Sequence, residues 1–175
     1  MARTIALLRG INVGGNKLVP MARLRELLEK LGFTDVATLL QSGNAVFTGK
    51  KASAKALESA LEKEFGFEVA VVLRTRDELA RVIDANPFAG PIDNPSKFVV
   101  TFLSGAPDQK AFAAIDQSRF APDDLRLVGQ EIYGRFPDGM GNSKLAAALA
   151  GLRLGVTQTA RNWNTVTKLL ELADR

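Results

Sequence analysis

The alternation of short apolar runs with amphipathic segments is the feature that most limits the folds open to this chain. An apolar run near the N-terminus precedes residues 20–31, where leucines recur at helical spacing until Gly32 ends the pattern. Two β-rich runs then flank the polar turn 41–44, which predicts a hairpin. The elements predicted for this half are strand 3–9, helix 20–31, strands 36–40 and 45–48, a helix around 57–65 and strand 69–73. Their order is that of a ferredoxin-like unit.

A connector rich in proline separates this half from a second succession of similar elements. Thr75–Glu78 reads as the capping box of a third helix, which ends at Asn86 before residues 87–96. The elements predicted beyond it are strand 98–103, helix 107–117, a hairpin of 125–128 with 132–136, a helix from about Asn142 or Ser143, and a last helix of about 162–173. That last helix carries Trp163 on its apolar stripe, and the pattern shows no counterpart for it in the first half.

We therefore predict an α+β fold of two ferredoxin-like halves, each β-α-β-β-α with antiparallel or mixed sheets, closed by a C-terminal helix. The predicted boundaries give residues 1–86 to the first half with its linking third helix, 87–96 to the connector and 97–175 to the second half. The two halves share almost no sequence identity, so the repeat is one of pattern.

The composition excludes several chemistries. The chain has no cysteine and no histidine, so it offers no thiol nucleophile, disulfide, imidazole base or Ser-His-Asp triad. An enzyme built on it would depend on Asp, Glu, Lys, Tyr or Ser, or on a metal held by carboxylates. A formal charge of +4 and a pI near 9.6 favour anionic partners. The N-terminal apolar run is too short for a signal peptide or a membrane span, so we expect a cytoplasmic protein without membrane contact.

The connection 9–20 contains three glycines, two asparagines, Arg9 and Lys17, more than a plain turn requires. Glycines allow a backbone to approach a ligand closely, and amides ahead of a helix suit an anion. The spacing fits neither a dinucleotide fingerprint nor a P-loop, because Asn16 precedes Lys17 and Leu18 stands where a P-loop has Ser or Thr. A long turn whose glycines relieve backbone strain is the alternative interpretation.

Three further stretches carry polar residues. The tetrapeptide 41–44 is a turn by itself, and we expect it at the opposite end of the sheet from 9–20. Ser143 and Lys144 stand at a helix N-terminus, which suits either a phosphate or a plain helix cap. Trp163 is expected to be buried, with neighbouring polar side chains projecting elsewhere. The candidate ligand-binding residues are Arg9, Asn12, Gly14, Gly15, Asn16, Lys17, Gln41, Ser42, Asn44, Ser143, Lys144, Arg161, Asn162 and Asn164. No catalytic residue, metal ligand or cofactor is predicted.

These polar stretches also carry a resemblance to a known family. The matching residues are 8–15 with Lys17 and Pro20, then 41–44, and finally Thr159 with 161–166. On them the chain resembles an uncharacterised bacterial family, domain of unknown function 1697. The resemblance implies an α+β fold of ferredoxin-like character and no assigned activity. It also implies that the three stretches form a shared surface.

The function favoured by these observations is binding of an anionic, phosphorylated small molecule or nucleotide. Nucleic-acid binding is an alternative, although the predicted central strands offer Phe47 without an RNP-like aromatic cluster, and Tyr133 is the only tyrosine. An enzyme using carboxylate or lysine chemistry, with Asp138 and Lys144 as candidates, is another. A structural partner protein that uses the Trp163 helix as its interface is the last. The sequence leaves the oligomeric state open.

Overall fold

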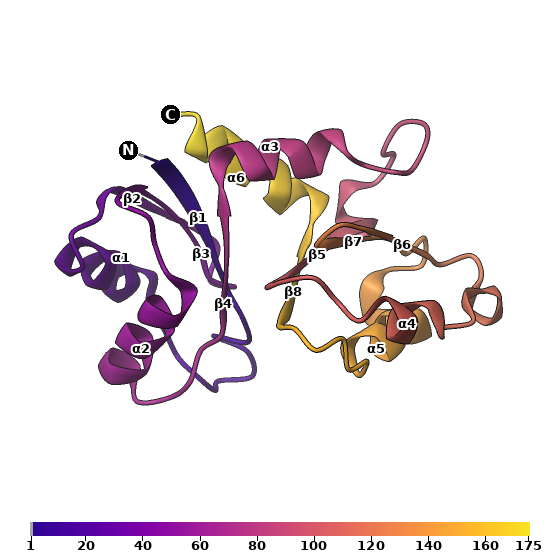
Figure 1. The fold of residues 1–175 in the computed structure, drawn as a ribbon, viewed down its shortest axis with the longest axis horizontal. Helices are drawn as coiled ribbons and strands as arrows, with labels where there is room; N and C mark the ends of the chain where they lie inside the picture. The colour runs from indigo at the N-terminus through magenta and orange to yellow at the C-terminus, as the bar shows by residue number, and fades with distance from the viewer. Residues whose placement is uncertain (1) are drawn as a thin grey trace. The chain divides into compact units, whose positions relative to one another are not determined.

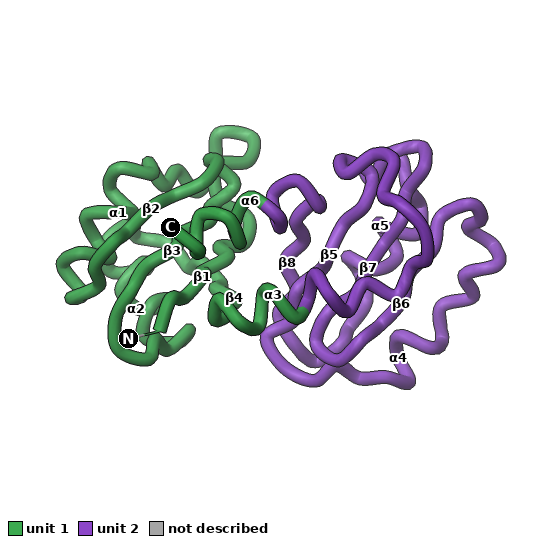
Figure 2. The backbone as a smooth tube through the Cα atoms, turned by 90° about the horizontal axis from the view of Figure 1, so that it is seen from above, with its two compact units in different colours: residues 1–81, 168–175 green, residues 82–167 purple. Residues whose placement is uncertain are grey.

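The computed structural model describes residues 2–175 of the chain (Figure 1). The chain divides into two compact units, one of residues 1–81 with 168–175 and one of residues 82–167 (Figure 2). Each unit contains one four-stranded sheet in which every neighbouring pair of strands is antiparallel. The predicted α+β class is therefore confirmed, and of the two predicted sheet types, antiparallel or mixed, both sheets are antiparallel.

The first unit places two helices against one face of its sheet (Figure 1). Its elements are β1 (Ala2–Leu8), α1 (Met21–Lys30), β2 (Thr34–Leu39), β3 (Asn44–Gly49), α2 (Ala54–Phe65) and β4 (Val71–Thr75). The strand order is β2-β3-β1-β4. Leu24 and Leu28 of α1 and Leu57 and Leu61 of α2 are buried in one core with alternate residues of β1 and β3. The buried leucines recur at the spacing of a helix, and the buried strand residues recur at every second position. These two spacings explain why the sequence predicted both the helices and the strands.

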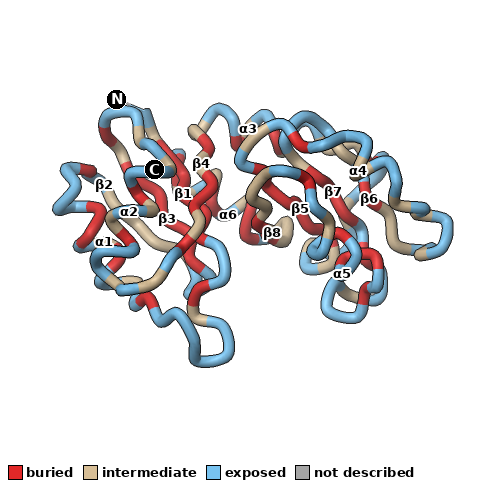
Figure 3. The backbone as a smooth tube through the Cα atoms, turned by 60° about the horizontal axis from the view of Figure 1, so that its bottom comes forward, coloured by how far each residue is buried: buried red, intermediate tan, exposed pale blue. Residues whose placement is uncertain are grey.

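The second unit has the same strand order around shorter helices. Its elements are β5 (Phe98–Leu103), α4 (Gln109–Ala113), β6 (Asp124–Val128), β7 (Glu131–Arg135), α5 (Lys144–Ala150) and β8 (Gln158–Asn162), with 3₁₀ turns at Pro95–Lys97, Gln117–Phe120 and Met140–Asn142. The order β6-β7-β5-β8 repeats that of the first sheet. Leu125, Ile132, Leu145 and Leu149 belong to its core. In both units the buried residues follow the strands while the connections are largely exposed (Figure 3).

Strand β8 corrects the sequence analysis, which gave the second half only three strands. The residues of β8 alternate between half-buried and buried, and the two buried ones, Thr159 and Arg161, are polar. A strand without apolar residues at its buried positions has no hydrophobic alternation to detect, which is why it was missed.

The last helix has a counterpart in the first half, contrary to the sequence-based expectation. Helix α6 (Trp163–Ala173) follows β8 without a connecting loop, just as α3 (Arg76–Asp84) follows β4. The repeat is thus β-α-β-β-α-β-α, twice over. The division into units falls within α3 and within α6.

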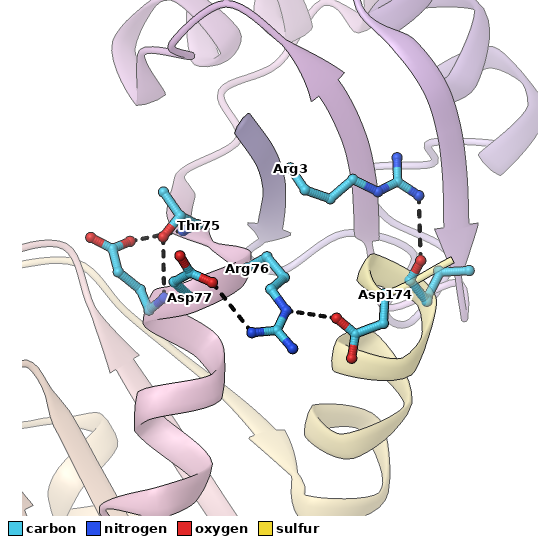
Figure 4. Close-up of polar contacts among 7 residues, drawn as sticks. Arg3, Thr75, Arg76, Asp77 and Asp174 are labelled. Carbon is cyan, nitrogen blue, oxygen red and sulfur yellow. Dashed lines mark hydrogen bonds and ion pairs between the residues drawn. The ribbon is translucent and has the colours of Figure 1, made fainter. Parts of the chain in front are cut away.

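The C-terminal turn of α6 is tied to other parts of the first unit by arginines (Figure 4). Nε of Arg76, at the start of α3, donates to Oδ1 of Asp174 at 2.6 Å, and NH2 of Arg3 donates to the carbonyl of Leu172 at 3.3 Å. The guanidinium of Arg76 lowers the pKa of Asp174, and the same pair raises the pKa of Arg76. Residues 168–175 are therefore part of the first unit although they end the chain.

Candidate functional site

The opening loop and the β2-β3 turn lie side by side at one end of the first sheet. The amide of Leu8 donates to the carbonyl of Gly43 at 2.8 Å, and Nδ2 of Asn12 donates to the carbonyl of Gln41 at 2.7 Å. The expectation that the two stretches occupy opposite ends is therefore wrong. Because α1 returns the chain to the start of β1, β2 runs parallel to β1 and its hairpin closes at the end where β1 stops. We call residues 9–20 and 40–44 the loop–hairpin surface.

Asn12 fixes this loop with both ends of its side-chain amide. Oδ1 accepts from the amide of Val19 at 2.8 Å, and Nδ2 donates to the carbonyl of Val19 at 3.0 Å as well as to Gln41. Asn12 also has φ 55°, a conformation that asparagine tolerates better than most residues. The side chain thus closes the loop upon itself and upon the hairpin.

Gly43 and Asn44 build the hairpin side of the surface. A Cβ at position 43 would lie 2.6 Å from Cδ1 of Ile11 and 2.9 Å from Cβ of Leu8, so only glycine permits the contact. Asn44 is fully buried, and its Nδ2 donates to the carbonyl of Leu39 at 2.7 Å and to Oγ of Ser42 at 3.2 Å. Ser42 and Asn44 therefore have structural roles in the turn.

The groups that face solvent on the loop are backbone amides and cations. Gly14 and Gly15 are exposed, and within residues 2–175 no hydrogen bond from either amide is found. Asn16 is also exposed and its amide donates to the carbonyl of Val13. Arg9 is exposed, and Nζ of Lys17 reaches the carbonyl of Glu68 at 3.1 Å. Because neither 9–20 nor 40–44 contains a carboxylate side chain, the surface is electropositive.

Helix α1 begins directly after this loop with its N-terminus uncapped. Pro20 occupies the capping position with no side-chain hydrogen bond, and the first turn contains no acidic residue. The first amides of a helix carry a partial positive charge that a carboxylate side chain or a bound anion can neutralise. Within the described residues no side chain caps this helix.

Unfavourable backbone conformations and exposed apolar side chains concentrate on the same surface. Of the four non-glycine residues with positive φ among residues 2–175, three lie here: Asn12, Lys17 and Leu40. Each such residue costs on the order of 1 kcal/mol, and such strain tends to cluster at functional sites. Val13, Leu18 and Leu40 are 67%, 61% and 56% exposed. The loop–hairpin surface therefore combines backbone strain with exposed apolar side chains, two features that often mark functional sites.

The candidate residues of the second unit have mainly structural roles. Oγ of Ser143 accepts from the amide of Ala146 at 3.0 Å and donates to Oδ2 of Asp123 at 2.6 Å, so Ser143 caps α5. Oδ1 of Asn162 accepts from the amide of Thr165 at 3.0 Å at the start of α6. Lys144 and Asn164 are exposed. The helix-cap interpretation of Ser143 is the one the structure shows.

Arg161 and Trp163 are held among neighbours in the second unit. NH1 of Arg161 donates to Oγ1 of Thr159 and to the carbonyl of Ala160, both at 2.8 Å, and burial lowers the pKa of Arg161 to about 10. Trp163 is half-buried and packs edge-to-face on Phe98 with the ring centroids 5.0 Å apart. The sequence predicted that Trp163 is buried, and in the structure its side chain is only partly buried.

A cavity of about 290 Å³ in the second unit escaped the sequence analysis. Residues 88–94 form one side of it, and the other side comes from the chain around Lys97 and Arg135. We call it the Phe88 cavity. It was missed because 87–96 read only as a connector, and because residues far apart in the chain meet in it. The aromatic and proline content of the connector was the one local signal.

Comparison with known proteins places the chain in a family. The model of a family described as protein of unknown function (DUF1697) matches residues 1–133. The chain belongs to this family. The resemblance to this family is confirmed, and the match covers the first two polar stretches, while the third lies beyond the matched residues. The match includes the loop–hairpin surface and the aromatic side of the Phe88 cavity, and it ends before Arg135.

Comparison of this DUF1697 member with a solved structure shows a shared fold. Its structure is similar to that of the conserved bacterial protein SP0830 from Streptococcus pneumoniae, with a TM-score of 0.74 at 23% identity over 98% of both chains. No curated protein matches its sequence. Within residues 2–175 no helix has the length and apolar character to cross a membrane, and no group of three or more acidic side chains is arranged to hold a metal ion.

Proposed function

We propose that this DUF1697 protein binds a phosphorylated small molecule at the loop–hairpin surface. The observation that carries the proposal is the uncapped N-terminus of α1, which is preceded in the same loop by the unbonded amides of Gly14 and Gly15. Phosphate groups bind well at helix N-termini, where free N–H groups and the positive end of the helix dipole face the anion. Arg9 and Lys17 supply two cations at the same surface.

The fixed shape of the loop supports this proposal. The three hydrogen bonds of Asn12 and the contact of Gly43 with Ile11 hold the loop before any ligand arrives. A preorganised loop loses little conformational freedom on binding, which favours affinity. We also class each unit as ferredoxin-like, since its strand order and βαββαβ succession are those of that fold.

The exposed apolar side chains suggest that the ligand is more than a bare phosphate. Val13, Leu18 and Leu40 belong to the same surface as the cations and are more than half exposed. A nucleotide or another phosphate ester with a flat apolar portion would bury some of this surface, whereas inorganic phosphate would not. We expect inorganic phosphate to bind more weakly than adenosine 5′-monophosphate.

A thermal-shift comparison of inorganic phosphate, glucose 6-phosphate, adenosine 5′-monophosphate and a short oligonucleotide tests the proposal. A ligand present at about one hundred times its Kd stabilises the folded protein by about 2.7 kcal/mol. For a chain of this size that corresponds to a rise in Tm of roughly 5 to 11 °C. Silence of all the small phosphates would contradict the proposal, and a response to the oligonucleotide alone would favour nucleic-acid binding.

The substitution Ala22→Glu separates the helix terminus from general charge effects. Ala22 is exposed in the first turn of α1, and a carboxylate there neutralises the helix dipole that the phosphate would use. We expect the free energy of unfolding of the free protein not to fall, while phosphate binding weakens by up to about fivefold. Ala22→Gln is the matched neutral control and should bind like the parent protein.

The substitution Lys17→Ala tests the loop cation. Loss of a charge-assisted hydrogen bond should weaken binding by about tenfold. Lys110→Ala, at an exposed lysine of α4, is its control. Equal binding by the Lys17→Ala, Ala22→Glu and control proteins would remove the site from this surface.

A further inference from the structure

The Phe88 cavity has apolar walls. Phe88 and Phe98 are buried and pack edge-to-face with ring centroids 5.5 Å apart, and both line the cavity. The other apolar side chains of the lining are Ala89, Pro91, Ile92, Phe136 and Pro137. A volume of about 290 Å³ lies just below the range typical of small-molecule sites, roughly 300–1,000 Å³. The cavity therefore suits a compact ligand with an apolar body.

Two cations in the same lining have no anionic partner. Among residues 2–175 neither Lys97 nor Arg135 takes part in an ion pair, and the one carboxylate in the lining, Asp93, is exposed and equally unpaired. The neighbouring Arg126 differs, because its NH2 lies 3.4 Å from Oδ2 of Asp124. The charge of Arg126 is thus balanced by Asp124 within the protein, whereas the charges of Lys97 and Arg135 are available to a ligand.

The walls are held in place by specific contacts. The guanidinium carbons of Arg126 and Arg135 each lie 4.4 Å from the centroid of the Phe88 ring, within the range of a cation–π interaction. NH1 of Arg126 also donates to the carbonyl of Pro87 at 3.0 Å, which fixes the start of the connector. On the other side, the amide of Phe136 donates to the carbonyl of Lys97 at 2.9 Å. The cavity is therefore formed before a ligand binds.

We propose that the Phe88 cavity is a second binding site, which takes a small organic anion with an aromatic or aliphatic body. The apolar part lies against Phe88 and Phe98, and the anionic group lies toward Lys97 and Arg135. This site is independent of the loop–hairpin surface, because all of its lining residues belong to the second unit. Either proposal can fail while the other stands.

The test uses two molecules of the same shape, 1-naphthoate and its uncharged amide 1-naphthamide, in isothermal titration calorimetry. The carboxylate should bind the parent protein at least about tenfold more tightly than the amide, because hydrogen bonds to charged groups are the stronger kind. Equal affinity for the two molecules, or no binding of either, would overturn the proposal.

Substitutions then assign the interaction to the cavity. Lys97→Gln and Arg135→Gln should each weaken naphthoate binding by about tenfold while changing naphthamide binding little. Lys97→Gln is the cleaner of the two, since Arg135 also contacts the Phe88 ring. The matched controls Lys110→Gln and Arg153→Gln, at exposed positions of the same unit, should bind like the parent. A loss in the controls equal to that in the cavity variants would overturn the assignment.

A third variant blocks the space itself. Ile92→Trp fills part of the cavity from an exposed connector and should reduce the affinity for both naphthoate and naphthamide, with circular dichroism confirming that the fold is intact. Unchanged binding in this variant would place the ligand elsewhere. None of these substitutions should alter the response to phosphorylated compounds at the loop–hairpin surface.

Discussion

The two units have the same strand order, but the connections that distinguish them follow β1 in the first unit and precede β5 in the second. In the first, helices of 10 and 12 residues cover the sheet, and the strained, tightly bonded region is the loop after β1. In the second, the corresponding helices have 5 and 7 residues, and the chain ahead of β5 forms one side of the open Phe88 cavity. The comparison teaches that this sheet order tolerates quite different connections, so each connection must be examined for function by itself.

Correspondence between the units reaches single residues despite the lack of sequence identity. Arg74 is the fourth residue of β4 and pairs with Ile5, and Arg161 is the fourth residue of β8 and pairs with Val100. Both arginines are buried. A buried arginine at equivalent positions of two fourth strands strengthens the interpretation of the chain as a structural repeat.

The largest effect is expected from a comparison of the two hairpin glycines. Gly43→Ala brings a Cβ within 2.6 Å of Ile11 at φ 94°, whereas Gly129→Ala in the second unit, at φ 61°, meets only Oε2 of Glu131 at 3.9 Å. Backbone strain costs about 1–2 kcal/mol in both, and overpacking adds about 1–3 kcal/mol at position 43 alone. Urea unfolding of the two variants measures the difference, and equal losses would mean that Gly43 is not a packing position.

A smaller effect is expected at Tyr133, whose counterpart in the first sheet is Val46. The Tyr133 hydroxyl is buried and donates to the carbonyl of Val82 at 2.5 Å. Tyr133→Phe should lower the free energy of unfolding by about 1–3 kcal/mol, because the Val82 carbonyl loses its partner. Urea unfolding measures the loss, and an unchanged free energy of unfolding would contradict this role of the hydroxyl.

The same tyrosine predicts a dependence on alkaline pH. Burial raises the pKa of Tyr133 above its ordinary value of about 10. The unfolded chain therefore ionises first, so the stabilisation is complete below pH of about 10 and is lost as pH rises toward the folded pKa. Since Tyr133 is the only tyrosine, the tyrosinate absorbance reports it alone. Its appearance at the ordinary pKa in the folded protein would contradict the burial.

The two repeated helices differ in their first residue, which is Arg76 in α3 and Trp163 in α6. The smallest effect on stability is expected from removing the ion pair that Arg76 forms. Arg76 pairs with Asp174 on the exposed surface and lowers the pKa of that carboxyl. The stabilisation is present above the ordinary carboxyl pKa and is lost as pH falls through the lower folded value. Asp174→Asn should thus change unfolding slightly at neutral pH and not at all in strong acid. A large change at neutral pH would show that the exposed pair matters more than such pairs usually do.

Apolar periodicity identified the strands and helices whose buried faces are hydrophobic, such as α1 with Leu24 and Leu28. It failed at β8, where Thr159 and Arg161 occupy buried positions. A polar strand is recognisable only once its partner β5 is in place, because hydrogen bonding to a neighbour rather than apolar burial defines it.

The candidate site shows the same limit. Glycine and asparagine content indicated residues 9–20, but the neighbour of Asn12 depended on the direction of β2. The Phe88 cavity depends on contacts between a connector and Arg135, which no local pattern records. Local composition predicts which segments are loops, whereas the order and direction of the strands determine which loops contact one another.

The measurement that tests the central claim most directly is a ¹H–¹⁵N spectrum of the labelled protein titrated with adenosine 5′-monophosphate. The account predicts saturable shifts, with one common Kd, in the amide signals of Gly14, Gly15 and the first turn of α1. It also predicts that Ala22→Glu raises this Kd. Unmoved signals at these amides, with shifts elsewhere or nowhere, would contradict phosphate binding at the loop–hairpin surface.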